Sequence, residues 1–72
     1  MNNEAKYEVI IYWSKTDNSF IAEVPELPGC MSDGNTKAEA LENVNTIILE
    51  WLETAKSLGR NIPEPKGKLM YA

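Results

Sequence analysis

Residues 23–36, with the sequence EVPELPGCMSDGNT, bring three carboxylates, the only cysteine and two glycines into one short stretch. Carboxylates this close in sequence could hold two divalent metal ions about 4 Å apart and support phosphodiester hydrolysis. A cysteine in the same stretch could serve as a nucleophile if a base activated it. The rest of the chain decides whether either chemistry is available.

The cysteine, Cys30, lacks the partners that such chemistry requires. The chain contains no histidine, which removes the usual base of a thiol nucleophile, the serine triad and the usual zinc sites. Cys30 is therefore expected to be a small buried residue. An unpaired thiol is typical of a reducing compartment. The sequence also lacks a signal peptide and an apolar run of about 18 residues, so we expect a cytoplasmic protein outside the membrane.

The three carboxylates, Glu23, Glu26 and Asp33, are predicted to lie in different local structures: a strand end, a proline corner and a turn. A metal-dependent nuclease would also need an acid in the middle of the first strand, where the chain has Ile10 and Ile11. We therefore predict no catalytic residues, no metal site and no cofactor. A metal-dependent nuclease stays open as the less favoured alternative.

The elements that must position these residues begin with three strands. Residues 7–13 are rich in β-branched and aromatic residues, and residues 20–24 follow a polar turn, so the two are predicted to form a hairpin. Pro25 and Pro28 lack the backbone donor that strand pairing uses. The chain is therefore predicted to turn a corner there before a short third strand at residues 30–32.

A long amphipathic helix is predicted from Thr36 to Leu58. Thr36 and Glu39 fit a capping box, in which the Thr36 hydroxyl accepts the Glu39 amide and the Glu39 carboxylate reaches back to the Thr36 amide. Apolar residues then recur at intervals of three and four, and Gly59 is a natural left-handed stop. Gly34, just before the helix, is predicted to need a backbone angle that other residues adopt poorly.

A last strand at residues 66–71 completes an α+β fold with the order β-β-β-α-β. A right-handed crossover through the helix would place this strand beside the first and parallel to it, which gives a small mixed sheet with the first strand central. One long helix can cover only one face of that sheet. The other face carries Ile10 and Tyr12, which we expect to form the interface of a homo-oligomer, either a dimer or a tetramer. Pairing through strand edges is the alternative.

The acidic surplus of the chain is confined to its first half. Residues 1–35 carry two positive and six negative side chains, whereas residues 36–72 carry five of each, and the net charge is −4. Such a surface repels phosphate, which argues against direct nucleic-acid binding, and attracts a basic partner. The simpler interpretation is that these acids keep a small protein soluble.

Six features follow one another along the chain: the hairpin 7–24, VPELPGC at 24–30, Gly34-Asn35-Thr36, EALEN at 39–43, Trp51 and IPEP at 62–65. Their order resembles the HicB family of antitoxins over nearly the whole chain. The resemblance implies a degenerate ribonuclease H fold that lacks the catalytic carboxylates. It also implies a partner, a small basic ribonuclease toxin of the HicA type, which degrades messenger RNA with a histidine and is blocked by binding.

The resemblance also bears on domain organisation. Many family members continue into a helix-turn-helix or ribbon-helix-helix domain that binds the promoter of the operon. This sequence stops at Ala72, so we expect a single HicB-like domain at residues 1–72 and no C-terminal DNA-binding domain. Two alternatives remain open. One is a solitary, self-associating adaptor or ligand-binding domain without a toxin partner, and the other is a nuclease of the ribonuclease H type.

We predict that a basic partner binds through the acidic first half of the chain. Leu27, expected to project from the proline corner, and Trp13 are the predicted apolar anchors, because such anchors usually supply most of the binding energy. The alternative for Trp13 is that it packs in the core of the protein itself. The predicted charged contacts, which would set the association rate, are Asp17, Glu23, Glu26 and Asp33.

Overall fold

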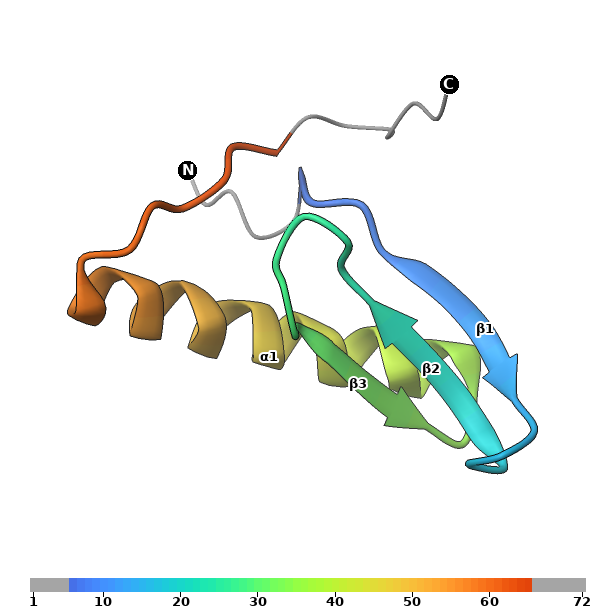
Figure 1. The fold of residues 1–72 in the computed structure, drawn as a ribbon. Helices are drawn as coiled ribbons and strands as arrows, with labels where there is room; N and C mark the ends of the chain where they lie inside the picture. The colour runs from blue at the N-terminus through green and yellow to red at the C-terminus, as the bar shows by residue number, and fades with distance from the viewer. Residues whose placement is uncertain (1–5, 66–72) are drawn as a thin grey trace, which may run out of the picture.

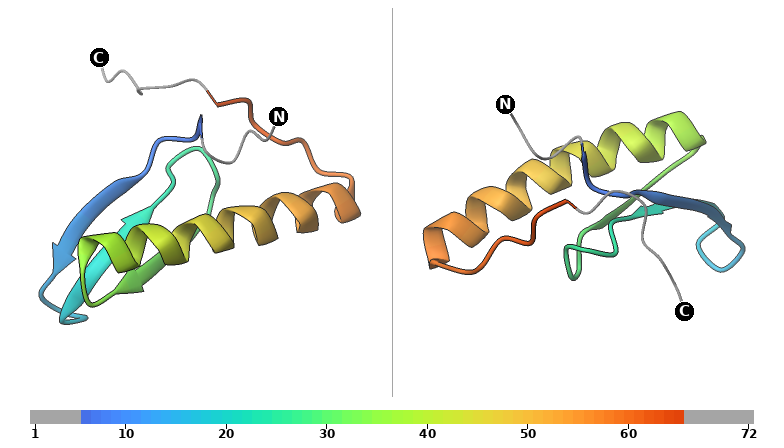
Figure 2. Two further views of the ribbon diagram at one scale, coloured as in Figure 1. Left: turned by 180° about the vertical axis from the view of Figure 1, so that it is seen from behind. Right: turned by 90° about the horizontal axis from the view of Figure 1, so that it is seen from above.

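The computed structural model describes residues 6–65 as a three-stranded antiparallel sheet followed by one long helix (Figure 1). The strands are β1 (Ile10–Ser14), β2 (Ser19–Glu23) and β3 (Met31–Gly34), and the helix is α1 (Lys37–Leu58). The strand order is β1-β2-β3, with β2 in the middle. Figure 2 shows that α1 lies along one side of the sheet, so the molecule has two layers.

The predicted α+β class and the β-β-β-α order are confirmed. The first strand begins at Ile10, later than predicted, because the chain before it turns to bury Tyr7 against the core. The predicted last strand at residues 66–71 lies outside the described residues. The parallel pairing and the central position of the first strand therefore stay predictions, and β1 is an edge strand only within the described sheet.

The strand register separates the side chains into two faces. On one face, Ile11 aligns with Ala22 and Phe20 with Gly34, and these positions meet the buried side of α1. Because side chains alternate along a strand, their neighbours point the other way. We call this second sheet face, turned away from α1, the open face; its residues are Ile10, Tyr12, Ile21, Glu23, Met31 and Asp33.

Local hydrogen bonds begin and end α1 much as the sequence predicts. The Thr36 hydroxyl accepts the Glu39 amide at 3.0 Å, which confirms Thr36 as the N-cap. The Glu39 carboxylate reaches back one residue further than predicted, to the Asn35 amide at 2.7 Å. At the other end, Gly59 has a φ of 70° and closes the helix in the left-handed conformation, as expected for a helix stop.

Gly34 has a different role from the predicted one. Its φ is not positive, unlike that of Gly29 and Gly59, so a special backbone angle does not explain it. Instead, β3 passes directly over the first turn of α1, and a Cβ added at Gly34 would lie 2.5 Å from the Ala40 amide nitrogen. The residue is needed because two backbones approach each other closely, and this approach sets the spacing of the sheet and the helix.

We therefore expect Gly34→Ala to lower the free energy of unfolding by about 1 to 3 kcal/mol, as other overpacking substitutions do. The added methyl meets backbone atoms of α1, which cannot move aside as a side chain can. Urea denaturation followed by circular dichroism measures the change. Ser32→Ala, on the same strand and the same sheet face, is the control. Equal denaturation midpoints for the two variants would contradict the close-packing explanation.

Candidate partner-binding surface

The corner after β2 is a compact turn that folds back on itself. The Leu27 amide donates to the Val24 carbonyl at 3.1 Å, and the Cys30 amide donates to the Leu27 carbonyl at 2.9 Å. The Val24 amide then closes the corner by donating to the Cys30 carbonyl at 3.0 Å. Gly29, with a φ of 78°, provides the left-handed step that this path needs.

The expectation that Leu27 projects from this corner is wrong. Its side chain is 0% exposed and belongs to the core. The hydrogen bonds of the corner turn it inward, and α1 holds the corner from the other side, where Trp51 Nε1 donates to the Pro28 carbonyl at 2.9 Å. Leu27 is therefore a structural residue, and Trp51 is an anchor of the corner that the helical periodicity alone did not reveal.

The thiol of Cys30 is closed off from chemistry at the surface. The side chain is buried in the core cluster, and burial raises the pKa of the thiol above its ordinary value. A raised pKa keeps the group protonated at neutral pH, and the neutral thiol is the poorer nucleophile. Within residues 6–65, no group of three or more His, Cys, Asp or Glu side chains is placed to hold a metal ion.

Three of the four predicted acidic residues come together on the open face. Asp17 and Asp33 line a hollow of ≈ 440 Å³, together with Ile21, Met31 and Ser32. Glu23 lies on the same face, directly across from Met31 in the strand register. The tight turn orients Asp17, because its Oδ2 accepts the Ser14 hydroxyl at 2.9 Å and its amide donates to the same hydroxyl at 3.2 Å.

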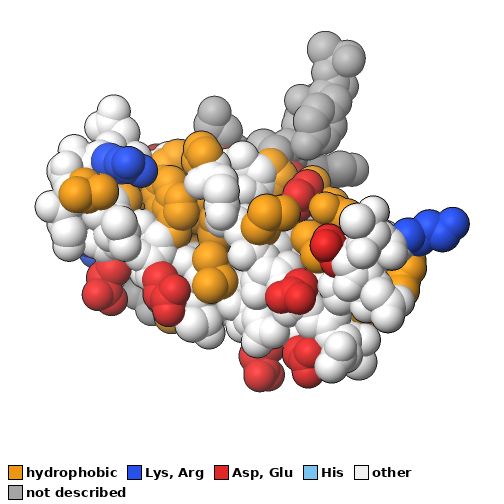
Figure 3. All heavy atoms as spheres, turned by 60° about the horizontal axis from the view of Figure 1, so that its bottom comes forward, with side chains coloured by type: hydrophobic (Ala, Val, Ile, Leu, Met, Phe, Trp, Pro, Cys, Tyr) orange, Lys and Arg blue, Asp and Glu red, His pale blue; other side chains and the backbone are white. Residues whose placement is uncertain are grey.

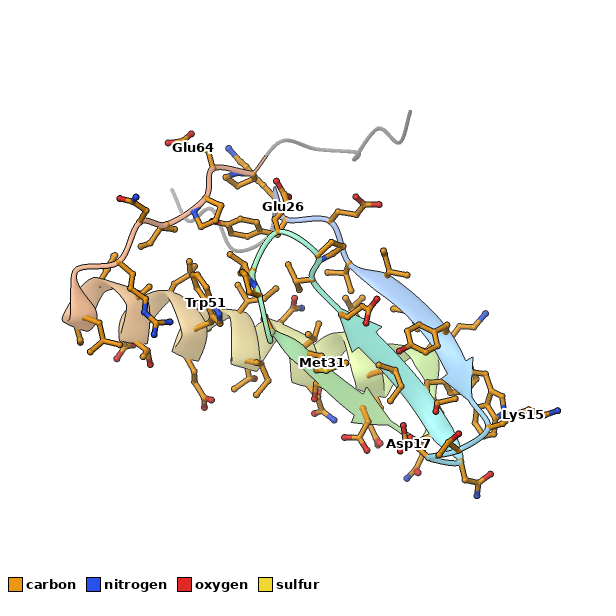
Figure 4. The ribbon with its side chains drawn as sticks, viewed as in Figure 1. Lys15, Asp17, Glu26, Met31, Trp51 and Glu64 are labelled. Carbon is orange, nitrogen blue, oxygen red and sulfur yellow. The ribbon has the colours of Figure 1, made fainter. Side chains whose placement is uncertain are left out.

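The fourth acid, Glu26, lies at the opposite end of the sheet from Asp17 (Figure 4). There Glu26 lies close enough to the buried Tyr7 for its negative charge, like that of Glu64, to disfavour ionisation of the tyrosine hydroxyl. The Tyr7 hydroxyl donates to the Pro63 carbonyl and so ties the start of the chain to the segment after α1. Burial, and then the two carboxylates, raise the pKa of Tyr7. Glu26 thus belongs to this tie and is apart from the acids of the open face.

Trp13 occupies an intermediate position. It is 48% exposed, yet its ring packs edge to face on Phe20, with the ring centroids 5.0 Å apart. By register it belongs to the helix side of the sheet, whereas Asp17, Glu23 and Asp33 border the open face. The large exposed apolar side chains on the open face are Tyr12 and Met31, which is 47% exposed. Sequence reasoning missed Met31, although its alternation with Asp33 in β3 placed both residues on one face.

The open face is thus partly apolar and acid-rimmed. Figure 3 shows hydrophobic side chains in a band that reaches from the sheet to the surface over the second half of α1, with acidic side chains along one side of it. This combination suits a protein partner with a basic, partly apolar surface, because apolar contacts supply affinity while charges steer the encounter.

Within the described chain, no helix is both long enough and apolar enough to cross a membrane.

Comparison with known proteins gives a family match and two relatives of similar length. A family model described as the HicB-like antitoxin of bacterial toxin–antitoxin systems matches residues 7–70. UPF0150 protein Ta0767 of Thermoplasma acidophilum is 41% identical over 58 residues, which cover 81% of this chain and 83% of the relative. UPF0150 protein ssl0259 of Synechocystis is 33% identical over 63 residues, which cover 88% of this chain and 85% of the relative. No solved structure matches.

The tie at Tyr7 leads to a pH-dependent prediction. We expect Tyr7→Phe to lower the free energy of unfolding by about 1 kcal/mol at neutral pH, because it removes one hydrogen bond to Pro63. Since the pKa of Tyr7 is raised in the folded state, the unfolded chain loses this proton first, at about pH 10. The difference in free energy of unfolding between the wild type and Tyr7→Phe should therefore be complete below pH 10 and shrink as the pH rises further.

Urea denaturation between pH 7 and pH 11 measures this difference. Tyr12→Phe, which alters an exposed tyrosine, is the matched control and should follow the wild type at every pH. A difference between wild type and Tyr7→Phe that stays constant above pH 10 would contradict the assigned effect of burial.

Proposed function

Because this chain belongs to the HicB-like antitoxin family of bacterial toxin–antitoxin systems, we propose that it binds and occludes a small basic ribonuclease toxin of the HicA type. The observation that carries the proposal is the open face, where Asp17, Glu23 and Asp33 border exposed apolar side chains. The protein would act by occupying the toxin surface, with no catalysis of its own.

The electrostatics of this surface support occlusion. A ribonuclease must present basic residues to hold the phosphates of its RNA substrate. The carboxylates of Asp17, Glu23 and Asp33 can occupy the same positively charged surface and exclude the substrate. Tyr12 and Met31 would supply apolar contact area, which carries most of the affinity in protein interfaces. Association would then be fast and sensitive to salt, and the complex would be held by the apolar contacts.

A non-catalytic role agrees with the placement of the reactive groups. The one thiol is buried and protonated at neutral pH, and the chain has no histidine to act as a base. The carboxylates of the open face lie at its rim, on a turn and on two strands. Because the proposed target degrades messenger RNA, the complex would form in the cytoplasm.

Self-association is the second candidate function for this surface. The exposed apolar area of the open face, with Ile10 and Tyr12 on β1, would be covered equally well in a homodimer or tetramer. A homo-oligomer built on this face would compete with the toxin for the same residues. Sedimentation of the protein with and without the toxin separates the two, because a toxin bound to the open face should dissociate the homo-oligomer.

We expect the double variant Asp17→Lys, Asp33→Lys to slow association with the toxin by about ten-fold or more at low salt, through loss of electrostatic steering. The measurement is stopped-flow binding across a salt series. The partner in this measurement is a HicA-type toxin made inactive by replacing its histidine. The difference between wild type and variant should shrink at high salt because ions screen the charges.

The matched control is Glu42→Lys, Glu53→Lys, which makes the same charge change on exposed positions of α1. We expect the control variant to associate at close to the wild-type rate. Association that ignores both salt and charge reversal on the open face would rule out the electrostatic mechanism. Failure of the wild type to bind the toxin at all would count against the antitoxin role itself.

A further inference from the structure

The outer edge of β3 presents backbone groups that the described sheet does not use. The bond from the Val24 amide to the Cys30 carbonyl extends the β2–β3 ladder by one pair. Antiparallel ladders alternate between bonded and non-bonded pairs, so the amides and carbonyls of Met31 and Asp33 point away from β2. A side chain confirms this direction, because Asn43 Nδ2 of α1 donates to the Asp33 carbonyl at 2.8 Å.

Helix α1 extends well beyond this edge. Its 22 residues make it about 33 Å long, and Figure 1 shows that it crosses the strands obliquely and continues past the start of β3. Figures 1 and 2 show the second half of α1 running past β3 with no described strand beside it. There a hollow of ≈ 230 Å³ is lined by Ile47, Glu50, Trp51, Thr54, Ala55 and Arg60.

This flank of the helix is apolar at the positions nearest to β3. Ile47 and Trp51 pack on the core but remain only half-buried. Trp51 lies on α1 beyond the start of β3, where Met31 lies (Figure 4). A chain segment placed beside β3 could therefore form hydrogen bonds with the outward backbone groups of β3 and pack on the apolar side chains of Ile47 and Trp51.

We propose that the toxin adds an extended segment to the outer edge of β3 as a fourth antiparallel or parallel strand. This inference rests on the proposed function and specifies how the partner is held. Side chains of an added strand alternate between its two faces. One set would pack on Ile47 and Trp51, and the other would lie on the open-face side next to Asp33 and near Asp17. The segment would therefore alternate apolar and basic residues.

The charges favour a basic partner over a second copy of this chain at the same edge. Symmetric pairing of β3 with itself would bring Asp33 of both copies close together, with Asp17 of each copy nearby. Like charges across neighbouring strands are destabilising. A basic segment meets the same carboxylates with opposite charge. Asn43, which already occupies one carbonyl of the edge, fits the general need to protect exposed strand edges from unwanted pairing.

Backbone amide exchange in the unaltered protein tests the proposal directly. With the inactive toxin bound, exchange at the Met31 and Asp33 amides should slow at least ten-fold in an NMR measurement, because both amides would become hydrogen-bonded. The Ser32 amide, which points into the β2–β3 ladder, is the internal control and should change much less. If the toxin binds and neither outward amide slows, the added strand is ruled out while the antitoxin role stands.

Two further results of the same experiment are informative. Slowing of both amides with rising protein concentration in the absence of toxin would show that a second copy occupies the edge, and would overturn the choice of a basic partner. No binding of the toxin to the wild type would overturn both this inference and the proposed function. The two failures are thus distinguishable.

A pair of substitutions at Met31 separates its backbone from its side chain. Met31→Pro removes an outward amide and leaves the inward ladder intact, which strand edges tolerate. Met31→Val shortens the side chain and keeps the amide. We expect the proline variant to bind the toxin about ten-fold more weakly than the valine variant. Equal affinities would overturn backbone pairing. Thermal melts verify folding, and the amide exchange measurement decides the question if the proline variant does not fold.

Discussion

One helix is available to cover a three-stranded sheet in the described part of this chain, and the rest of the structure depends on that limit. Burial on α1 uses one face of the sheet, so Tyr12 and Met31 on the other face remain at the surface. The helix also continues past the start of β3, which leaves its second half partly uncovered. Both surfaces follow from two layers of unequal size. A small domain of this kind has strong physical reason to bind another protein.

Close backbone contacts hold the two layers in a defined arrangement. Gly34 lets the end of β3 approach the first turn of α1, and the Trp51 bond to Pro28 attaches the corner to the middle of the helix. Between these two points the helix packs on the buried residues of β2 and the corner, including Ala22 and Leu27. These two contacts fix β3 near its two ends, and the side chains of Met31 and Asp33 therefore point to the open face from a strand in a defined position.

The residues that first suggested hydrolysis are separated by the same arrangement. Cys30 is turned into the core, Glu26 lies near Tyr7, and Glu23 and Asp33 lie on the open face, where Asp33 borders a hollow together with Asp17. Within residues 6–65 these acids form no group of three or more that could hold a metal ion, but their charges can act together on an approaching basic protein. The chemistry of the stretch is therefore better suited to recognition than to catalysis.

The sequence by itself determined the local elements. The hairpin, the proline corner, the Thr36 cap and the Gly59 stop all depend on residues within a few positions of each other, so periodicity and turn chemistry sufficed to predict them. The family resemblance was also readable, because it rests on short motifs in a fixed order. Only the tertiary structure decided that Leu27 is buried and that Glu26 is apart from the other acids. It likewise showed that Gly34 is needed for close approach. Each of these depends on contacts between segments distant in sequence, and local patterns carry no information about which residue another layer will cover.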